Sequence, residues 1–271
     1  MRCALLLLAV ASVLAAACSD TGATGQPDAT PSAASTNGIG APTQPATAPS
    51  ETTVARPGST PVTGQTATIG EAVLGPFEIV TADGLTLEGF RFGSGTTFVV
   101  LAHMRPAEMS SWFAFAGLLA GDGYTAITFN FRGYGNSDGA GFAVDVDVAA
   151  AVDAAIALGA RKVFVVGASM GATGSVVAAS RRDVAGVIAL SAPAEFLSSN
   201  AEAAARTVTA PMLLIAAADD LSYADEAERI RAASGGPAEV VILPGRRHGT
   251  DLFQQHSEQL TALILDFLAL P

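Results

Sequence analysis

Two short segments near residue 80 alternate between apolar and polar positions, as strands with one solvent-facing side do. They are FEIVT at 77–81 and LTLEGFRF at 85–92, and the linker 82–84 reads Ala-Asp-Gly. An Asp-Gly pair between alternating strands is typical of a hairpin turn. We therefore expect a β-hairpin at the start of the folded part of the chain.

After residue 92 the pattern changes to short runs that are apolar at consecutive positions. These runs are TTFVVLAH (96–103), YTAITFNF (124–131), KVFVVGA (162–168), AGVIALSA (185–192), PMLLIAAA (211–218) and AEVVILP (238–244). Such runs are typical of strands that are buried on both faces of a parallel sheet. Helix-like stretches lie between and after them, at 110–123, 144–159, 171–183, 223–236 and 251–270. Strands that alternate with helices predict an α/β fold, here a doubly wound, mostly parallel sheet of about eight strands.

The N-terminal part of the chain has neither pattern. A short positive region is followed by an apolar stretch at 4–17, which has the length of a signal peptide and not of a transmembrane helix. Residues 19–70 are rich in Pro, Ser, Thr, Gly, Ala and Gln and show no apolar periodicity, so they cannot bury enough surface to offset the entropy of ordering. We expect a signal peptide at 1–17, a disordered tether at 18–70 and one folded domain at 71–271.

The apolar stretch ends in LAAACS, which resembles the lipobox of bacterial lipoproteins. The resemblance implies that Cys18 carries lipid as the first mature residue and that the chain is extracytoplasmic, attached to a bacterial membrane through this anchor only. The alternative is an ordinary secretory signal and release from the cell. Cys3 leaves with the signal peptide, so a lipidated mature chain has no thiol pair for a disulfide.

Charge and composition exclude several classes of function. The net charge is −11 and Lys162 is the only lysine, so no basic stripe exists and nucleic-acid binding is not expected. The sequence shows no cluster of metal ligands and no phosphate-cradling loop, so we expect neither a metal nor a cofactor.

The G-x-S-x-G pattern of a nucleophile elbow occurs twice, as GNSDG at 135–139 and as GASMG at 167–171. Ser169 of the second match lies between a predicted strand and a predicted helix, which is the context that the elbow requires. A helix that begins there directs free N–H groups toward an oxyanion beside the serine. The alternative interpretation of Ser169 is a serine that only caps the helix.

Small residues around Ser169 agree with a tight turn. Gly167 and Gly171 lie two residues before and after the serine, where bulk is not tolerated, and Gly174 would let the helix pack close to the sheet. Ser137, in the first match, enters a glycine-rich loop with no helix directly behind it. We interpret Ser137 as a turn serine that bonds local backbone.

Five segments resemble, in order, the landmark segments of α/β-hydrolases: FVVLAHMRP, ITFNFRGYGNSDG, VVGASMGA, PMLLIAAADD and LPGRRHG. The resemblance covers about 77–271 and implies the α/β-hydrolase fold with a Ser-His-Asp triad. It assigns Ser169 as the nucleophile and His248 as the base. It assigns Asp220 as the acid, with Asp219 as the second choice and Glu195 as a lesser candidate.

The same resemblance implies the remaining parts of the site. The backbone N–H groups of Met170 and Arg105 would stabilise the oxyanion. Among the other histidines, His103 would be structural near the oxyanion loop, and His256 falls on the apolar stripe of the last helix. The sequence departs from the family pattern at Met104 and Ala217, where glycine is usual, and at Asn130, where aspartate is usual.

These features predict a serine hydrolase that cleaves carboxylic esters of small or exposed acyl groups. A peptidase or a thioesterase on the same triad is an alternative, because a triad does not define the leaving group. A surface-tethered binding protein on a non-catalytic hydrolase fold is the alternative from another class. Residues 193–210 are too few for a lid or cap, so an open site is expected. Candidates for its apolar walls are Met104, Met109, Trp112, Phe113 and Tyr223, and packing in the core is the alternative for each of them.

The lipid anchor can be tested directly. We expect the full-length protein, expressed in bacteria, to incorporate radiolabelled palmitate and the Cys18→Ser variant to incorporate none. Two or more acyl chains hold a protein on a membrane, whereas one chain does so only marginally. Release of unlabelled wild-type protein into the medium would contradict the anchor and favour simple secretion.

Overall fold

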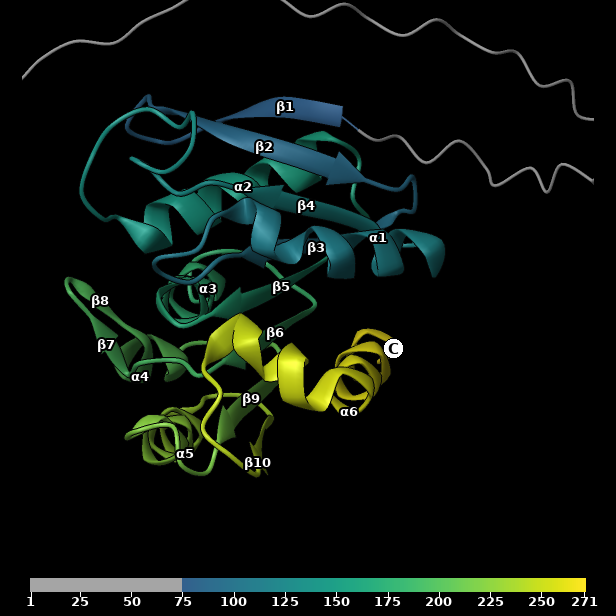
Figure 1. Cartoon of the computed structure of the whole chain (residues 1–271). Helices are drawn as coiled ribbons and strands as arrows, with labels where there is room; N and C mark the ends of the chain where they lie inside the picture. The colour runs from purple at the N-terminus through teal and green to yellow at the C-terminus, as the bar shows by residue number, and fades with distance from the viewer. Residues whose placement is uncertain (1–74) are drawn as a thin grey trace, which may run out of the picture. The chain divides into compact units, whose positions relative to one another are not determined.

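The structure, a computed structural model, describes residues 75–271 (Figure 1). The predicted signal peptide, the tether up to residue 70 and the lipidation site Cys18 lie outside the described residues. None of the helices within 75–271 combines the length and the apolar character needed to cross a membrane.

The hairpin and the predicted alternation of strands and helices are both present. The strands of the main sheet are β1 Gly75–Val80, β2 Thr86–Phe92, β3 Thr97–Ala102, β4 Thr125–Phe129, β5 Lys162–Ala168, β6 Gly186–Leu190, β9 Met212–Ala217 and β10 Ala238–Leu243. The helices are η1 Met109–Trp112, α1 Phe113–Gly121, α2 Val144–Ala157, α3 Met170–Ala179, α4 Ala201–Ala205, α5 Tyr223–Ala233, η2 Gly249–Asp251 and α6 Leu252–Leu268. The order of strands in the eight-stranded sheet is β1-β2-β4-β3-β5-β6-β9-β10.

Strand directions confirm a mostly parallel sheet. β1 and β2 are antiparallel to their neighbours, and every pair from β4 to β10 is parallel. The central strands β4, β6 and β9 are buried at every residue, as their continuous apolar runs predict. The run at 238–244 differs, because β10 is an edge strand and is only partly buried.

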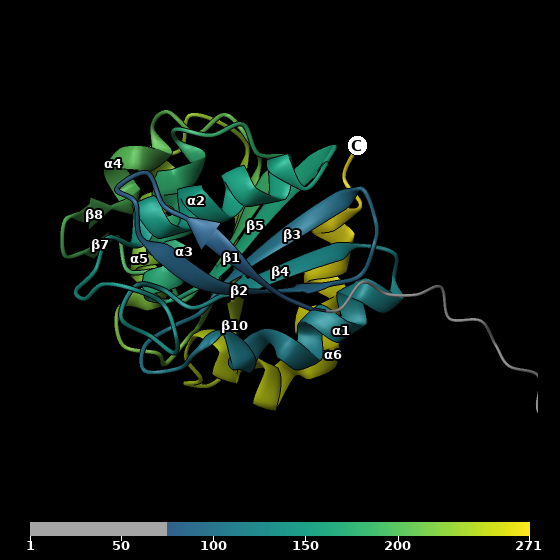
Figure 2. The same cartoon turned by 90° about the horizontal axis from the view of Figure 1, so that it is seen from above.

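Helices cover both faces of the sheet, as the doubly wound prediction requires (Figures 1 and 2). α2, α3, α4 and α5 pack in sequence on one face, while α1 and α6 lie on the other. Val99 and Leu101 belong to the apolar cluster beneath α1 and α6, whereas Phe98 and Val100 belong to the opposite cluster. Alternate residues of one strand thus supply two separate cores.

The segment between β6 and β9 contains no cap domain. It holds a two-stranded hairpin, β7 Glu195–Phe196 with β8 Ser199–Asn200, and the one-turn helix α4. The absence of a cap was predicted from the length of this segment, whereas the hairpin and the short helix were not predicted.

The last helix departs from the prediction at His256. This residue has φ −128° and ψ 33°, which kinks α6 inside the range predicted as one helix. Its Nε2–H donates to the carbonyl oxygen of Pro244 at 2.8 Å. His256 therefore connects α6 to the loop after β10, and it does not simply pack in a continuous apolar stripe.

A buried ion pair fixes the long loop 130–143 after β4. The guanidinium of Arg132 donates to Asp147 of α2 at 2.7 Å and to Asp83 of the β1–β2 turn at 2.8 Å. Asp147 is fully buried, and its carboxylate also accepts the backbone N–H of Arg132. Because an unpaired charge in this position would be costly, the ion pair holds the loop against α2.

Candidate active site

The carboxyl ends of the parallel strands bring distant segments of the chain together. Register pairs place Ala102 of β3 beside Gly167 of β5, and Ala168 of β5 beside Leu190 of β6. The loops after β3, β5, β6, β9 and β10 therefore lie side by side along one edge of the sheet. This edge is where ligands bind in open α/β sheets.

Ser169 forms the turn between β5 and α3 in a strained conformation. Its φ of 51° and ψ of −119° are unusual for a residue with a side chain and cost about 1–3 kcal/mol. Its backbone N–H donates to the Leu190 carbonyl at 2.8 Å, which anchors the turn to β6. The hydroxyl makes no capping bond to α3, so the structure does not support a helix-capping role. Ser169 is half-buried at the sheet edge, and within residues 75–271 its hydroxyl makes no hydrogen bond, to His248 or to any other residue.

Glycines allow the turn to approach its neighbours. A Cβ on Gly171 would lie 2.5 Å from the Ala102 carbonyl oxygen and 2.6 Å from that of His103. Only glycine therefore lets α3 begin directly against the end of β3. Gly174 does not face the sheet as predicted: a Cβ there would lie 2.8 Å from the Val144 carbonyl oxygen, so this glycine serves the contact between α3 and α2.

His248 and Asp220 form the central polar contact of the edge. The Nδ1–H of His248 donates to Asp220 Oδ2 at 2.8 Å. The Asp220 carboxylate is buried, and the imidazole keeps about a quarter of its surface, 27%, exposed. Donation from Nδ1 leaves the Nε2 lone pair of a neutral imidazole available as a proton acceptor.

The other two acidic candidates are not in this position. Asp219 is exposed, and its contact with the next loop runs through its backbone N–H, which donates to the Gly245 carbonyl. Glu195 lies on the β7–β8 hairpin and accepts from the Asn200 amide at 2.6 Å. Of the three acids considered from the sequence, only Asp220 contacts His248.

An aromatic side chain covers the His248–Asp220 pair. The ring of Tyr223, at the start of α5, lies 4.5 Å from the imidazole ring between centroids and is tilted by 47°. The Tyr223 N–H donates to the Asp220 carbonyl, which fixes the helix start beside the acid. Burial, followed by the nearby carboxylates of Asp220 and Glu226, raises the pKa of Tyr223, so its phenol is neutral at physiological pH.

The loop of His248 rests on the loop of Ser169. A Cβ on Gly249 would lie 3.3 Å from the Ala168 Cβ and 2.6 Å from the Met104 sulfur. Gly249, which follows His248, therefore lies against the end of β5 and against the loop after β3. The Gly249 N–H donates to the buried Ser191 hydroxyl at 3.0 Å. The sequence did not indicate this role of Ser191, because a serine at a strand end carries no signal of its own.

Met104 fills the space above Gly249. It is nearly buried, and its sulfur occupies the volume that a side chain at position 249 would need. The glycine at position 249 therefore leaves room for a methionine at position 104, one of the departures from the α/β-hydrolase pattern noted in the sequence. Met104 joins the loop after β3 to the loop of His248.

The two predicted oxyanion donors lie at the same edge of the sheet as Ser169. Met170 opens α3, where helix N–H groups have no intrahelical partner. Arg105 follows the end of β3 by three residues. Neither backbone N–H is used in a hydrogen bond to another residue of 75–271.

The remaining candidates have structural contacts. His103 is fully buried; its Nδ1–H donates to the Met104 carbonyl, and its Nε2 accepts the Phe131 N–H. An acceptor role for Nε2 requires the neutral ring, and burial lowers the pKa of His103 to about 4. Ser137 donates to the Asn130 carbonyl and accepts the Glu88 N–H, so its hydroxyl is occupied.

Asn130 explains one departure from the family pattern. Its Oδ1 accepts the Met109 N–H at 2.9 Å, and its Nδ2 donates to Glu88 Oε2 at 2.8 Å. An aspartate could accept the first bond but could not donate the second. The amide therefore matches the glutamate of β2.

Two of the predicted apolar walls belong instead to the core beneath α1. Trp112 is fully buried against Phe115 and Phe253, and Phe113 packs on Phe90 and Phe92. Tyr223 is the predicted wall residue that lies against His248.

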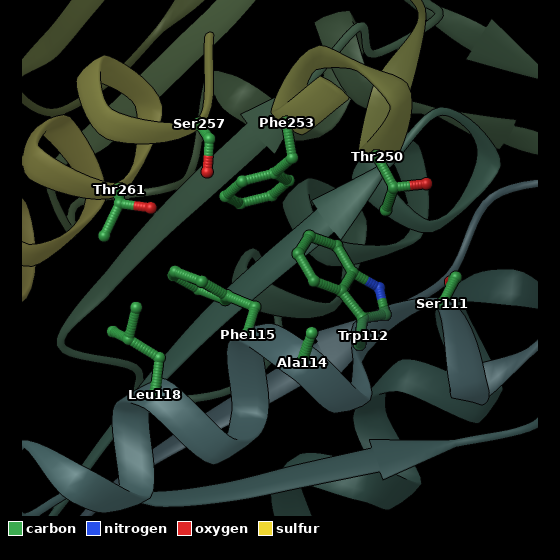
Figure 3. Close-up of a pocket in the computed structure, with 9 residues that line it drawn as sticks. All are labelled: Ser111, Trp112, Ala114, Phe115, Leu118, Thr250, Phe253, Ser257 and Thr261. Carbon is green, nitrogen blue, oxygen red and sulfur yellow. The ribbon is translucent and has the colours of Figure 1, made fainter. Parts of the chain in front are cut away.

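A groove of about 210 Å³ lies between α1 and α6 (Figure 3). Its aromatic floor includes Phe115 and Phe253, and hydroxyl groups surround it. The lining residues are Ser111, Trp112, Ala114, Phe115, Leu118, Thr250, Phe253, Ser257 and Thr261. None of the lining residues is charged, and neither His248 nor Asp220 is among them.

Comparisons with known proteins agree with this topology. A family profile described as alpha/beta hydrolase fold matches residues 97–219. No curated protein sequence matches the chain. Among solved structures, an esterase from Pyrococcus furiosus is 18% identical with a TM-score of 0.63, covering 73% of this chain and 90% of its own.

Two further structures are similar at comparable identity. A homologue of α/β serine hydrolases from Coxiella burnetii is 20% identical with a TM-score of 0.61, covering 72% of this chain and 97% of its own. An esterase from Exiguobacterium antarcticum is 15% identical with a TM-score of 0.58, covering 70% of this chain and 98% of its own. Together with the strand order, these matches show that the chain has the α/β-hydrolase fold.

The buried His103 makes stability depend on pH. The folded protein disfavours protonation of this ring, whereas the unfolded chain protonates it near pH 6.5, so stability is full above that pH and is lost as the pH falls toward 4. Urea unfolding at pH 7.5 and pH 5 should show a loss of about 2 kcal/mol in wild type that is absent in His103→Gln. Equal losses in wild type and His103→Gln would contradict the attribution of this pH dependence to His103.

Proposed function

We propose that this chain is a serine hydrolase that cleaves carboxylic esters through Ser169, His248 and Asp220. The observation that carries the proposal is the hydrogen bond between His248 and the buried Asp220, in a loop that rests beside the strained turn of Ser169. A serine hydroxyl needs an adjacent base to act as a nucleophile, and the base needs an acid that sets its tautomer. The fold and its esterase neighbours support the same reading.

In the proposed reaction the Ser169 Oγ attacks the ester carbonyl while its proton passes to His248 Nε2. The resulting oxyanion accepts hydrogen bonds from the N–H groups of Met170 and Arg105, each of which contributes about 3 kcal/mol to barrier lowering in comparable sites. Collapse of this intermediate breaks the C–O bond, and His248 returns the proton to the leaving alcohol. A water molecule, deprotonated by the same Nε2, then releases the acid from the acyl-enzyme.

Asp220 and Tyr223 act on the imidazolium that forms during both steps. The carboxylate holds Nδ1–H, and the aromatic ring lies within the distance at which π faces attract a cation. Because the positive charge exists only along the reaction path, these contacts favour the transition state over the ground state.

The chain's predicted location remains part of the proposal. Lipid on Cys18 would attach the hydrolase to the membrane of a bacterial cell, and a tether of about fifty residues would place it tens of ångströms away on a random-coil estimate. The small β7–β8 hairpin in place of a cap suits soluble or wall-associated esters better than bilayer lipids.

The nucleophile is tested with two serine variants of matched sequence context. Ser169→Ala should lower kcat/KM for p-nitrophenyl butyrate by roughly 10³-fold or more while thermal unfolding is little changed. Ser137→Ala, in the other G-x-S-x-G match, should keep most of the activity. Labelling by a fluorophosphonate probe should follow the same order. A similar loss in both variants would overturn the assignment, and a wild type that neither turns over esters nor takes the label would favour a binding protein.

The roles of His248 as base and Asp220 as acid are tested against a second histidine and the neighbouring aspartate. His248→Ala and Asp220→Asn should each lower kcat/KM by roughly 10²-fold or more, because they remove the base or its tautomer. His256→Ala and Asp219→Asn should leave turnover largely intact, and His256→Ala should lower the unfolding free energy through the lost bond to Pro244.

The pH dependence gives a second measurement on the same proteins. Activity should rise with pH through the range in which an imidazole ordinarily titrates, since the proton must be absent from Nε2 at the start. A folded His256→Ala variant without activity would show that the wrong histidine was chosen. Rates on thioester and anilide substrates of the same acyl group would separate esterase from thioesterase or peptidase action.

A further inference from the structure

Two hydrogen-bond donors, on the loops after β3 and β4, have no acceptor within residues 75–271. The Arg105 guanidinium lies over the ring of Phe142, 5.7 Å from its centroid. Its charge also acts on the Tyr134 phenol, where it opposes the rise in pKa that burial causes. Within residues 75–271, neither the guanidinium nor the phenol hydroxyl is hydrogen-bonded to another side chain or to backbone.

Arg105 forms no ion pair with another residue of 75–271. Five arginines of this part pair with carboxylates, namely Arg132, Arg181, Arg182, Arg229 and Arg231, whereas Arg91, Arg161, Arg206, Arg246 and Arg247 do not. Glu195, on the neighbouring β7–β8 hairpin, is bonded to the Asn200 amide. Arg105 is exposed and follows β3 at the sheet edge that carries Ser169, so its charge can meet an anionic group of a bound substrate.

The surroundings hold both donors in place. Tyr134 packs edge-on against the buried His103 ring at 4.9 Å. Phe142 is supported by Phe196 of the β7–β8 hairpin, with 5.4 Å between ring centroids. The loop 130–143, which carries Tyr134 and Phe142, is fastened to α2 by the buried ion pair of Arg132. Tyr134 thus stands on a packed loop, and the Phe142 ring beneath Arg105 is held by the β7–β8 hairpin.

The strand order places these donors on one side of Ser169. Loops after β4 and β3 carry them, whereas Asp220 and His248 come from the loops after β9 and β10, beyond β5 and β6. His248 must face the leaving alcohol in order to protonate it. In the orientation proposed below, the acyl part of the ester extends to the other side, toward the Arg105 side chain.

We propose that Arg105 and Tyr134 form a carboxylate-binding subsite that selects esters whose acyl part ends in a second, anionic carboxylate. The inference rests on the proposed function and adds the substrate class to it. A guanidinium offers the fork of donors that matches a carboxylate, the phenol adds a third donor, and Phe142 supports the methylene chain. The product would be a dicarboxylic acid and an alcohol.

The test compares two esters of matched length, mono-p-nitrophenyl glutarate and p-nitrophenyl pentanoate, with the purified full-length protein. Wild type should favour the glutarate ester in kcat/KM. Arg105→Gln should reduce the ratio of the two values about five- to tenfold, and Tyr134→Phe should reduce it by a smaller factor. The preference should weaken with added NaCl, because an exposed charge contact is screened.

The matched control is Arg161→Gln. Arg161 is exposed and lies just before β5, at the opposite end of the strand that leads to Ser169. The ratio in this variant should equal that of wild type. A wild type that prefers the neutral ester, or an equal change in Arg161→Gln and Arg105→Gln, would overturn the subsite while leaving the hydrolase assignment intact.

A binding measurement separates the two proposals if turnover is absent. Glutarate dianion should raise the melting temperature of wild type and of Ser169→Ala, and it should have no effect on Arg105→Gln. Stabilisation of all three proteins alike, or of none, would contradict the subsite independently of any catalysis.

Discussion

Six adjacent parallel strands that are apolar at consecutive positions impose the arrangement on which everything else depends. Strands of this kind are stable only between two layers of helices, and parallel strands end at one common edge. All loops that follow the strands therefore gather there. Ser169, Asp220 and His248 are spread over eighty residues of sequence, yet they reach one edge because β5, β9 and β10 run in the same direction.

Close backbone packing converts this shared edge into defined geometry. Gly171 lets α3 begin against the last carbonyl groups of β3, and Gly249 lets the His248 loop rest on Ala168 under the Met104 sulfur. Ser191 joins the same region through the Gly249 N–H. The strained backbone of Ser169 is tolerated because neighbouring strands and helix determine it from several sides.

The edge has two chemically different sides. On one side the His248–Asp220 pair lies under Tyr223, with a paired carboxylate and an aromatic cover. On the other side lies Arg105, which forms no ion pair within residues 75–271 and lies over the Phe142 ring. The groove between α1 and α6 is separate from this edge, and its lining residues are uncharged.

The sequence by itself determined the fold class and the alternation of the main strands and helices along the chain, and it indicated Ser169 rather than Ser137 as the candidate nucleophile. These follow from local properties: hydrophobic period, strand–turn–helix context and the small residues of one turn. The resemblance favoured Asp220 and left Asp219 as a second choice, and only the tertiary structure shows that Asp220 contacts His248, because the turn directs the two side chains differently. The tertiary structure also decided that Trp112 is core, that Gly174 serves α2 and that His256 kinks the last helix. Each depends on contacts between elements far apart in the chain, and no local pattern encodes such contacts.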